Sequence, residues 1–217
     1  MLTHTPREVA VCLASFLWGY KVGDNLAFNF KTLFFLYENR EDTVDAKKHL
    51  LNKYICITIV SIIEAIFYDF ILRLDGATTH FPSSIPTEKK AAIKETLNKD
   101  KVKRTRGDTL TGETIEFYRV RNYSLNQMIE IMKKFELLGR ADDSLYERLE
   151  KAGHLRNRIH IVNWFNNFEV DEEGVFIDLR VTVLEDLLDS VINIMTSTYK
   201  RPFDSGQEEF WYKKITI

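Results

Sequence analysis

Residues 143–163 read DSLYERLEKAGHLRNRIHIVN, and this stretch decides how we interpret the rest of the chain. Its apolar side chains recur at helical spacing, which predicts one amphipathic helix: Leu145, Leu149, Ala152, Leu155, Ile159 and Val162. Arg156 and His160 are four residues apart, so they would be neighbours on one face of that helix, at the border of the apolar stripe and beside Asn163. Asn157 and Arg158 would point elsewhere and be available to other partners.

The longest helical pattern lies upstream, from Thr43 to Leu74, and its broad apolar stripe is typical of the central helix of a bundle. Glu64 lies within this stripe. If buried, its carboxylate needs a partner, for which Arg156 is a candidate; the alternative places Glu64 on a hydrated helix edge. The run Tyr54–Leu72 is apolar enough to raise the question of a membrane span, but Glu64 and Asp69 interrupt it, and we expect a core helix.

Further segments show patterns of regular structure. A short helix is expected over Thr87–Leu97. The sequence Ser-Leu-Asn-Gln at 124–127 is a capping box that opens a helix running to Leu138. A second capping box, Thr-Val-Leu-Glu at 182–185, is expected to begin a later helix that ends near residue 200. Between them, Phe168–Asp178 carries Asp-Glu-Glu-Gly at its centre and predicts one small β-hairpin.

The 217 residues include only 9 Gly and 4 Pro, which suits long helices better than many tight turns. We predict an all-α protein with an antiparallel bundle of four to five helices over residues 43–217. Residues 1–42 would form an aromatic, helical N-terminal extension, interpreted either as extra core packed on the bundle or as an oligomer contact. The tail that contains Phe210, Trp211 and Tyr212 is expected to fold back onto the body.

The formal net charge of -2 excludes a global field that would draw the protein to nucleic acid or to anionic lipid. Any contact with RNA must therefore come from a local patch. Lys101, Lys103 and Arg104 lie in one basic stretch, residues 99–106, around a single Asp100. We consider two interpretations of this stretch: a solvated loop, or a patch that contacts phosphates.

Other chemistries lack their signatures. The nine Gly are scattered and form no phosphate-binding loop, and no Ser lies in a nucleophile-elbow sequence. His154 and His160 share the predicted helix but point to different faces, so we expect no metal site and no cofactor. Cys12 and Cys56 lie in apolar runs and are expected to be reduced core residues. With no secretory signal in the sequence, these features predict a cytoplasmic protein.

The sequence Leu155-Arg-Asn-Arg-Ile-His160, together with the Glu64-Ala65 step in the upstream helix, resembles the HEPN superfamily of small helical proteins. The mark of that family is an arginine, usually followed by Asn, Asp or His, with four to six residues between the arginine and a later histidine. Here three residues separate Arg156 from His160. The resemblance covers roughly residues 43 to 200 and implies a HEPN-like helical bundle.

The resemblance implies a metal-independent endoribonuclease, such as a toxin or a phage-defence effector, that acts as a homodimer with two motifs facing one cleft. His160 would be the general acid and base, because histidine titrates near neutrality. Arg156 would stabilise the scissile phosphate, and Asn157 would orient the phosphate or the backbone. Arg158, together with Lys101, Lys103 and Arg104, would contact the RNA substrate.

Two alternatives stay open. The first is a non-catalytic HEPN-like module that binds a nucleotidyltransferase or another defence protein encoded in the same operon. The short spacing between Arg156 and His160 and the near-neutral charge favour this alternative. The second is an unrelated helical dimer, in which His160 only packs on an arginine that pairs with Glu64 or Glu150.

Overall fold

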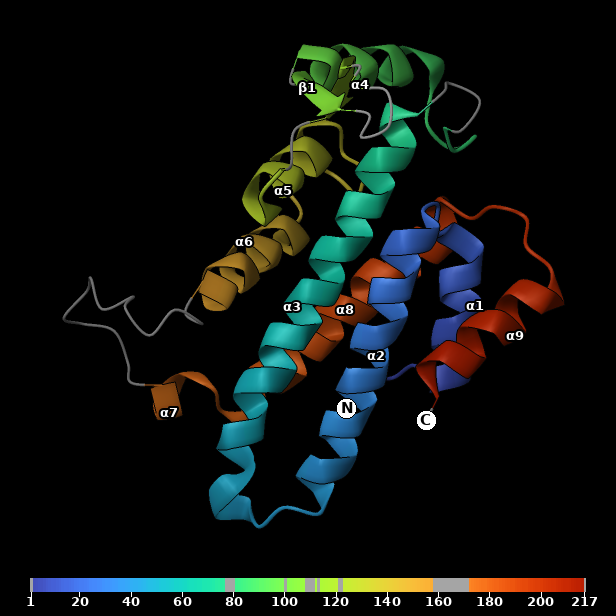
Figure 1. Ribbon diagram of the computed structural model, residues 1–217. Helices are drawn as coiled ribbons and strands as arrows, with labels where there is room; N and C mark the ends of the chain where they lie inside the picture. The colour runs from blue at the N-terminus through green and yellow to red at the C-terminus, as the bar shows by residue number, and fades with distance from the viewer. Residues whose placement is uncertain are drawn as a thin grey trace.

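The computed structural model describes residues 2–76, 81–99, 101–107, 112, 114–120, 123–157 and 172–216. The protein belongs to the all-α class, as predicted, with one two-stranded antiparallel hairpin (Figure 1). The helices are α1 (Pro6–Phe16), α2 (Tyr20–Glu41), α3 (Asp45–Asp75), α4 (Thr87–Lys99), α5 (Leu125–Lys134), α6 (Ser144–Asn157), α7 (Glu172–Val175), α8 (Asp178–Thr198) and α9 (Ser205–Ile215). The strands are β1 (Lys101–Gly107) and β2 (Thr114–Val120).

Helix α3 is the centre of the fold, as its broad apolar stripe predicts. It packs against α2, α4, α5, α6 and α8 (Figure 1), and its side chains from Ile55 to Leu74 supply much of the buried core. By length and composition alone α3 could cross a membrane, although 61% of its most apolar window is buried inside the protein. The apolar stripe therefore has protein neighbours on several sides.

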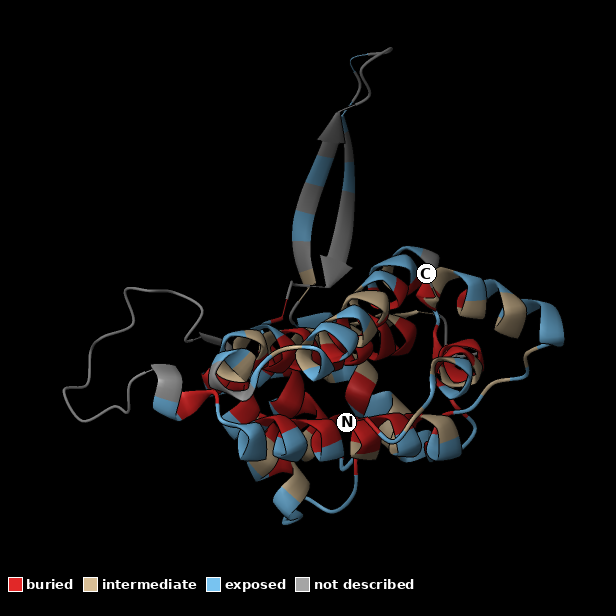
Figure 2. Cartoon of the chain, turned by 90° about the horizontal axis from the view of Figure 1, so that it is seen from below, coloured by how far each residue is buried: buried red, intermediate tan, exposed pale blue. Residues whose placement is uncertain are grey.

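Helices α1, α2 and α9 share one hydrophobic core with α3 and α8. In α2, Leu26, Phe30 and Leu33 are fully buried, which agrees with the core interpretation of the N-terminal aromatic stretches. Phe28 and Phe35 lie on the outer face of the same helix and are 68% and 50% exposed. The C-terminal tail returns to the body as α9, which packs on α1 and α2 (Figure 1), and its Trp211 is buried. Figure 2 shows buried residues gathered between the helices and exposed residues on their outer faces.

The hairpin is not where the sequence predicts it. The expectation for Phe168–Asp178 is wrong over residues 172–178, where α7 and the first residue of α8 lie; residues 168–171 are outside the described part of the chain. Strands β1 and β2 pair instead, with Lys103 opposite Tyr118. The strands are rich in charged residues, and their described side chains lie largely at the surface. The sequence therefore lacks the alternation of apolar and polar residues that predicts a strand.

Two helix boundaries also differ from the expectation. Helix α8 begins at Asp178 rather than at Thr182, because the Asp178 carboxylate accepts hydrogen bonds from Arg40 Nη2 at 2.7 Å and from Asn52 Nδ2 at 2.8 Å. Helix α5 begins at the predicted capping box but ends at Lys134 rather than at Leu138. Tyr146, which is fully buried, holds the turn that follows: its hydroxyl accepts a hydrogen bond from the Leu138 N–H at 3.0 Å.

Candidate functional site

Helix α6 carries the described part of the motif. The helix expected over residues 143–163 is described from Ser144 to Asn157, and residues 158–163 lie outside the described part of the chain. The helix forms because its apolar face, which includes Leu149, Ala152 and Leu155, is buried against α3, α5 and α8. Its last turn therefore has a fixed place beside the central helix and α8.

Of the predicted catalytic residues, the structure positions only two along the backbone. Arg156 and Asn157 end α6, and nothing is described of their side chains. Arg158 and His160 lie outside the described residues, so the contact between Arg156 and His160 stays a prediction. Glu64 is half-buried on α3, the helix against which α6 packs, and its pairing with Arg156 also stays a prediction.

A groove of about 380 Å³ runs between α6 and α8, alongside the turn that leads to Arg156. We call it the α6–α8 groove. Its floor is apolar and comes from Ala152, Leu155, Val183, Leu184 and Leu187, while its rim is polar and comes from Arg148, Lys151, His154 and Arg180. An apolar floor with a few polar groups at the edge is the usual construction of a binding site.

The groove is electropositive. Among the described residues, three cationic side chains and no carboxylate line it, although the whole protein carries a formal charge of -2. Lys151 Nζ pairs with Glu147 Oε1 at 2.6 Å on the outer surface of α6, and this contact lowers the pKa of Glu147. Arg148 Nη2 donates to the backbone oxygen of Val183 at 3.2 Å, which ties α6 to α8. Anions such as phosphates are therefore favoured at this rim.

Exposed apolar side chains continue the groove along the first turns of α8. Ile177 is 44% exposed, Leu179 67% and Val183 42%. Large apolar side chains that gather beside a binding groove are typical of a surface that meets another macromolecule. The α6–α8 groove thus combines phosphate-attracting charge with a surface that favours protein contact.

The predicted basic patch lies on the hairpin and is partly neutralised. Lys101 Nζ is 3.0 Å from Asp75 Oδ1, and Lys103 Nζ is 2.7 Å from Glu116 Oε2 across the two strands. Nothing is described of the Arg104 side chain. Paired lysines attract phosphate less than unpaired ones do, so the two described lysines of this patch, like Lys151 in the groove, are weaker candidates for RNA contact than Arg148 and Arg180.

Sequence reasoning missed Arg148 and Arg180. On α6, Arg148 and Leu155 are seven residues apart, and on α8 the same spacing separates Arg180 from Leu187, so each pair lies on one helix face. That signal identifies each face separately. It does not reveal that the two faces oppose each other, because α6 and α8 become neighbours through tertiary packing, in which each contacts α3 and the other.

Among the described residues, no group of three or more His, Cys, Asp or Glu is placed to hold a metal ion. Cys56 is buried, and burial raises the pKa of its thiol to about 12, so it stays protonated at neutral pH. No protein-family model, no curated protein and no solved structure matches the chain. The site must therefore be judged on its own chemistry.

Proposed function

We propose that the protein is a metal-independent endoribonuclease with a HEPN-like bundle, and that RNA lies in the α6–α8 groove beside Arg156, Asn157 and His160. The observation that carries this proposal is the described lining of the groove, which has Arg148, Lys151 and Arg180 and no carboxylate, beside the helix that ends in the Arg-Asn motif. The bundle topology of that family, a cytoplasmic location and the homodimer are parts of the same proposal.

The chemistry follows from the residue types. His160 takes the proton of the ribose 2′-hydroxyl, whose oxygen attacks the adjacent phosphorus, and a protonated histidine gives a proton to the leaving 5′-oxygen. Arg156 stabilises the charge that develops on the phosphorus, and Asn157 orients the phosphate. The products are a 2′,3′-cyclic phosphate and a 5′-hydroxyl. The groove cations Arg148 and Arg180 hold neighbouring phosphates of the strand.

Two histidines on the same stretch of chain allow a matched test of this chemistry. His160→Ala should abolish RNA cleavage in EDTA, whereas His154→Ala, at the rim of the groove, should reduce cleavage by less than about tenfold because it contributes binding alone. Mass spectrometry of the products should show the cyclic phosphate. Cleavage that survives His160→Ala, or that disappears in EDTA, would remove the proposed mechanism.

A second candidate function is a non-catalytic module that binds a protein partner at the same groove. The exposed apolar side chains of Leu179 and Val183 favour it, because such a surface is stabilised when a partner covers it. This candidate predicts no cleavage of RNA and a complex with a protein encoded in the same operon. Leu179→Asp should disrupt that complex, whereas Leu50→Asp, which changes an equally exposed leucine on α3, should not.

A further inference from the structure

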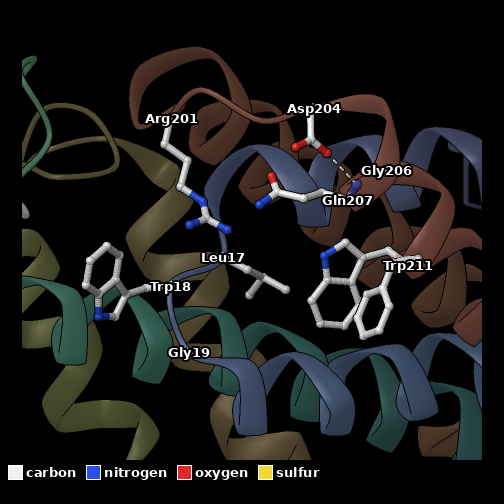
Figure 3. A pocket seen from close by; sticks show the side chains of 9 residues that line it. Leu17, Trp18, Gly19, Arg201, Asp204, Gly206, Gln207 and Trp211 are labelled. Atoms are coloured by element: carbon white, nitrogen blue, oxygen red, sulfur yellow. Dashed lines mark hydrogen bonds between the residues drawn. The ribbon is translucent and has the colours of Figure 1, made fainter.

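A second pocket lies where the link between α1 and α2 meets α9. We call it the α9 pocket; its volume is about 270 Å³. Its walls come from Leu17, Trp18, Gly19, Arg201, Asp204, Gly206, Gln207, Phe210 and Trp211. Figure 3 shows Trp18 on one side and Trp211 on the other, with Leu17 between them and the side chains of Arg201 and Gln207 extending into the space above.

The walls of the α9 pocket are held by buried contacts. The Asp69 carboxylate, on α3, accepts hydrogen bonds from the backbone N–H groups of Trp18 at 2.8 Å and Gly19 at 2.7 Å, which fixes the link between α1 and α2. Trp211 lies so close to α2 that a Cβ atom at Gly23 would be 2.2 Å from its ring. The Trp211 ring and the backbone at Trp18 are therefore positioned before any ligand arrives.

Arg201 gives the α9 pocket a cation. Its backbone N–H donates to the Ser15 oxygen at 2.7 Å, which anchors the residue, while its Nε atom is buried and has no hydrogen-bond partner among the described residues. Its charge is close enough to Asp69 to favour the ionised carboxylate there. The Nε atom is itself closed to solvent, but the Arg201 side chain lines the pocket, where a ligand carboxylate or phosphate would meet its positive charge.

We propose that the α9 pocket binds a small planar aromatic anion, whose ring lies over Leu17 with Trp18 on one side and Trp211 on the other, and whose carboxylate or phosphate meets Arg201. A cationic ligand is disfavoured because Arg201 would repel it. Asp204, the only carboxylate that the described part of the chain contributes to the lining, caps α9 by accepting the Gln207 N–H at 2.9 Å. The volume is near the lower end of the ~300–1,000 Å³ of small-molecule pockets, so the ligand carries one or two rings.

This site is separate from the proposed ribonuclease site. The α9 pocket is lined by the link between α1 and α2, by the link between α8 and α9 and by α9 itself, whereas α6 and α8 line the groove (Figure 1). Failure of either proposal leaves the other standing. Ligand binding at the α9 pocket can therefore be measured without RNA.

The test uses two pairs of probes and the full chain. Indoleacetate and adenosine monophosphate carry a carboxylate and a phosphate, and indole and adenosine are their neutral counterparts. At least one anionic probe should bind and shift the indole N–H resonances of Trp18 and Trp211, while its neutral counterpart binds about tenfold more weakly. Trp164→Phe removes the third indole signal and leaves the two that line the pocket.

Arg201→Gln should weaken the anionic probe by about tenfold and leave the neutral one unchanged, because only the charge-assisted contact is lost. Arg140→Gln, on an exposed arginine outside the pocket, is the matched control and should change neither. Trp18→Leu, at a 38% exposed position, weakens both probes and covers the case in which the Arg201 variant does not fold. Absence of binding by both anions, or equal binding of charged and neutral probes, overturns the proposal.

Discussion

The α6–α8 groove and the α9 pocket are similar in kind but differ in how the fold holds them. The groove cations lie at the surface, where Arg180 is exposed and Lys151 forms an ion pair with Glu147. The α9 pocket depends on buried groups, with Trp211 only 6% exposed and Asp69 1% exposed. Substitutions in the groove should therefore change binding and leave stability nearly unchanged, whereas substitutions around the α9 pocket should change stability as well.

The largest effect is expected at Trp211. Trp211→Ala should lower the free energy of unfolding by about 3–5 kcal/mol, because the substitution leaves a cavity between α9 and α2. Trp18→Ala, in the same pocket but 38% exposed, should cost clearly less. Urea unfolding followed by circular dichroism measures both. Equal decreases in the free energy of unfolding would mean that the buried and the exposed indole contribute equally to stability, contrary to this prediction.

A pH effect is expected from Asp69. Burial raises the pKa of its carboxyl to about 6, above the ~3.9 of an unfolded chain. Between these values the folded protein holds a proton that the unfolded chain releases, so this contribution to stability is present below about pH 4 and is lost as the pH rises through 6. Arg73 and Arg201 limit the shift, because both favour the ionised form.

Asp69→Asn cannot titrate and isolates this contribution. The free energy of unfolding of the wild type, relative to that of the variant, should fall by roughly 2 kcal/mol between pH 4 and pH 7, because the folded pKa of about 6 lies well above the ~3.9 of the unfolded chain. Chemical unfolding at several pH values measures this difference. A difference that increases with pH would mean that the N–H donors and arginines outweigh burial.

A smaller decrease in the free energy of unfolding is expected for a substitution at Gly23. Gly23→Ala places a methyl group against the Trp211 ring, so α2 and α9 must separate slightly, and overpacking of this kind costs about 1–3 kcal/mol. Asn25→Ala, at an exposed position two residues further along α2, is the control and should change stability by less than about 0.5 kcal/mol. A stabilising Gly23→Ala would show that α9 is not closely packed there.

The smallest effect on stability is expected in the groove. Arg180→Gln should change the free energy of unfolding by less than about 0.5 kcal/mol. It should nevertheless weaken RNA binding and reduce the slope of log affinity against log salt by about one, because one phosphate contact is lost. Lys103→Gln, on the paired lysine of the hairpin, should leave the slope nearly unchanged. If Lys103→Gln reduced the slope and Arg180→Gln did not, the hairpin rather than the groove would be the RNA-binding surface.

Helical periodicity predicted the regular elements well wherever one face is buried. Helix α3 follows its apolar stripe, and the capping box at Ser124 marks the start of α5. Helical periodicity does not predict a helix boundary that depends on side chains distant in the sequence. Asp178 begins α8 because Arg40 and Asn52, far away in the sequence, meet its carboxylate, and no local pattern carries that information.

The candidate sites show the same division. The motif around Arg156 is visible in the sequence because it consists of residue types at fixed spacing. The roles of Arg180 in the groove and of Arg201 in the pocket are not visible in the sequence. Each of these residues lies beside residues from another part of the chain. The composition does not indicate a cationic groove either, because a net charge of -2 is an average over the whole chain and is compatible with a local group of cations.

By itself, the sequence determined that this protein is helical and that α3 is its centre, because apolar periodicity over a long helix leaves few other ways to remove those side chains from water. Only the tertiary structure decided which helix faces oppose each other. It thereby placed Arg148 across from α8, and Trp211 against Gly23. Those contacts join residues far apart in the chain, and their energies depend on packing and burial, which no local pattern specifies.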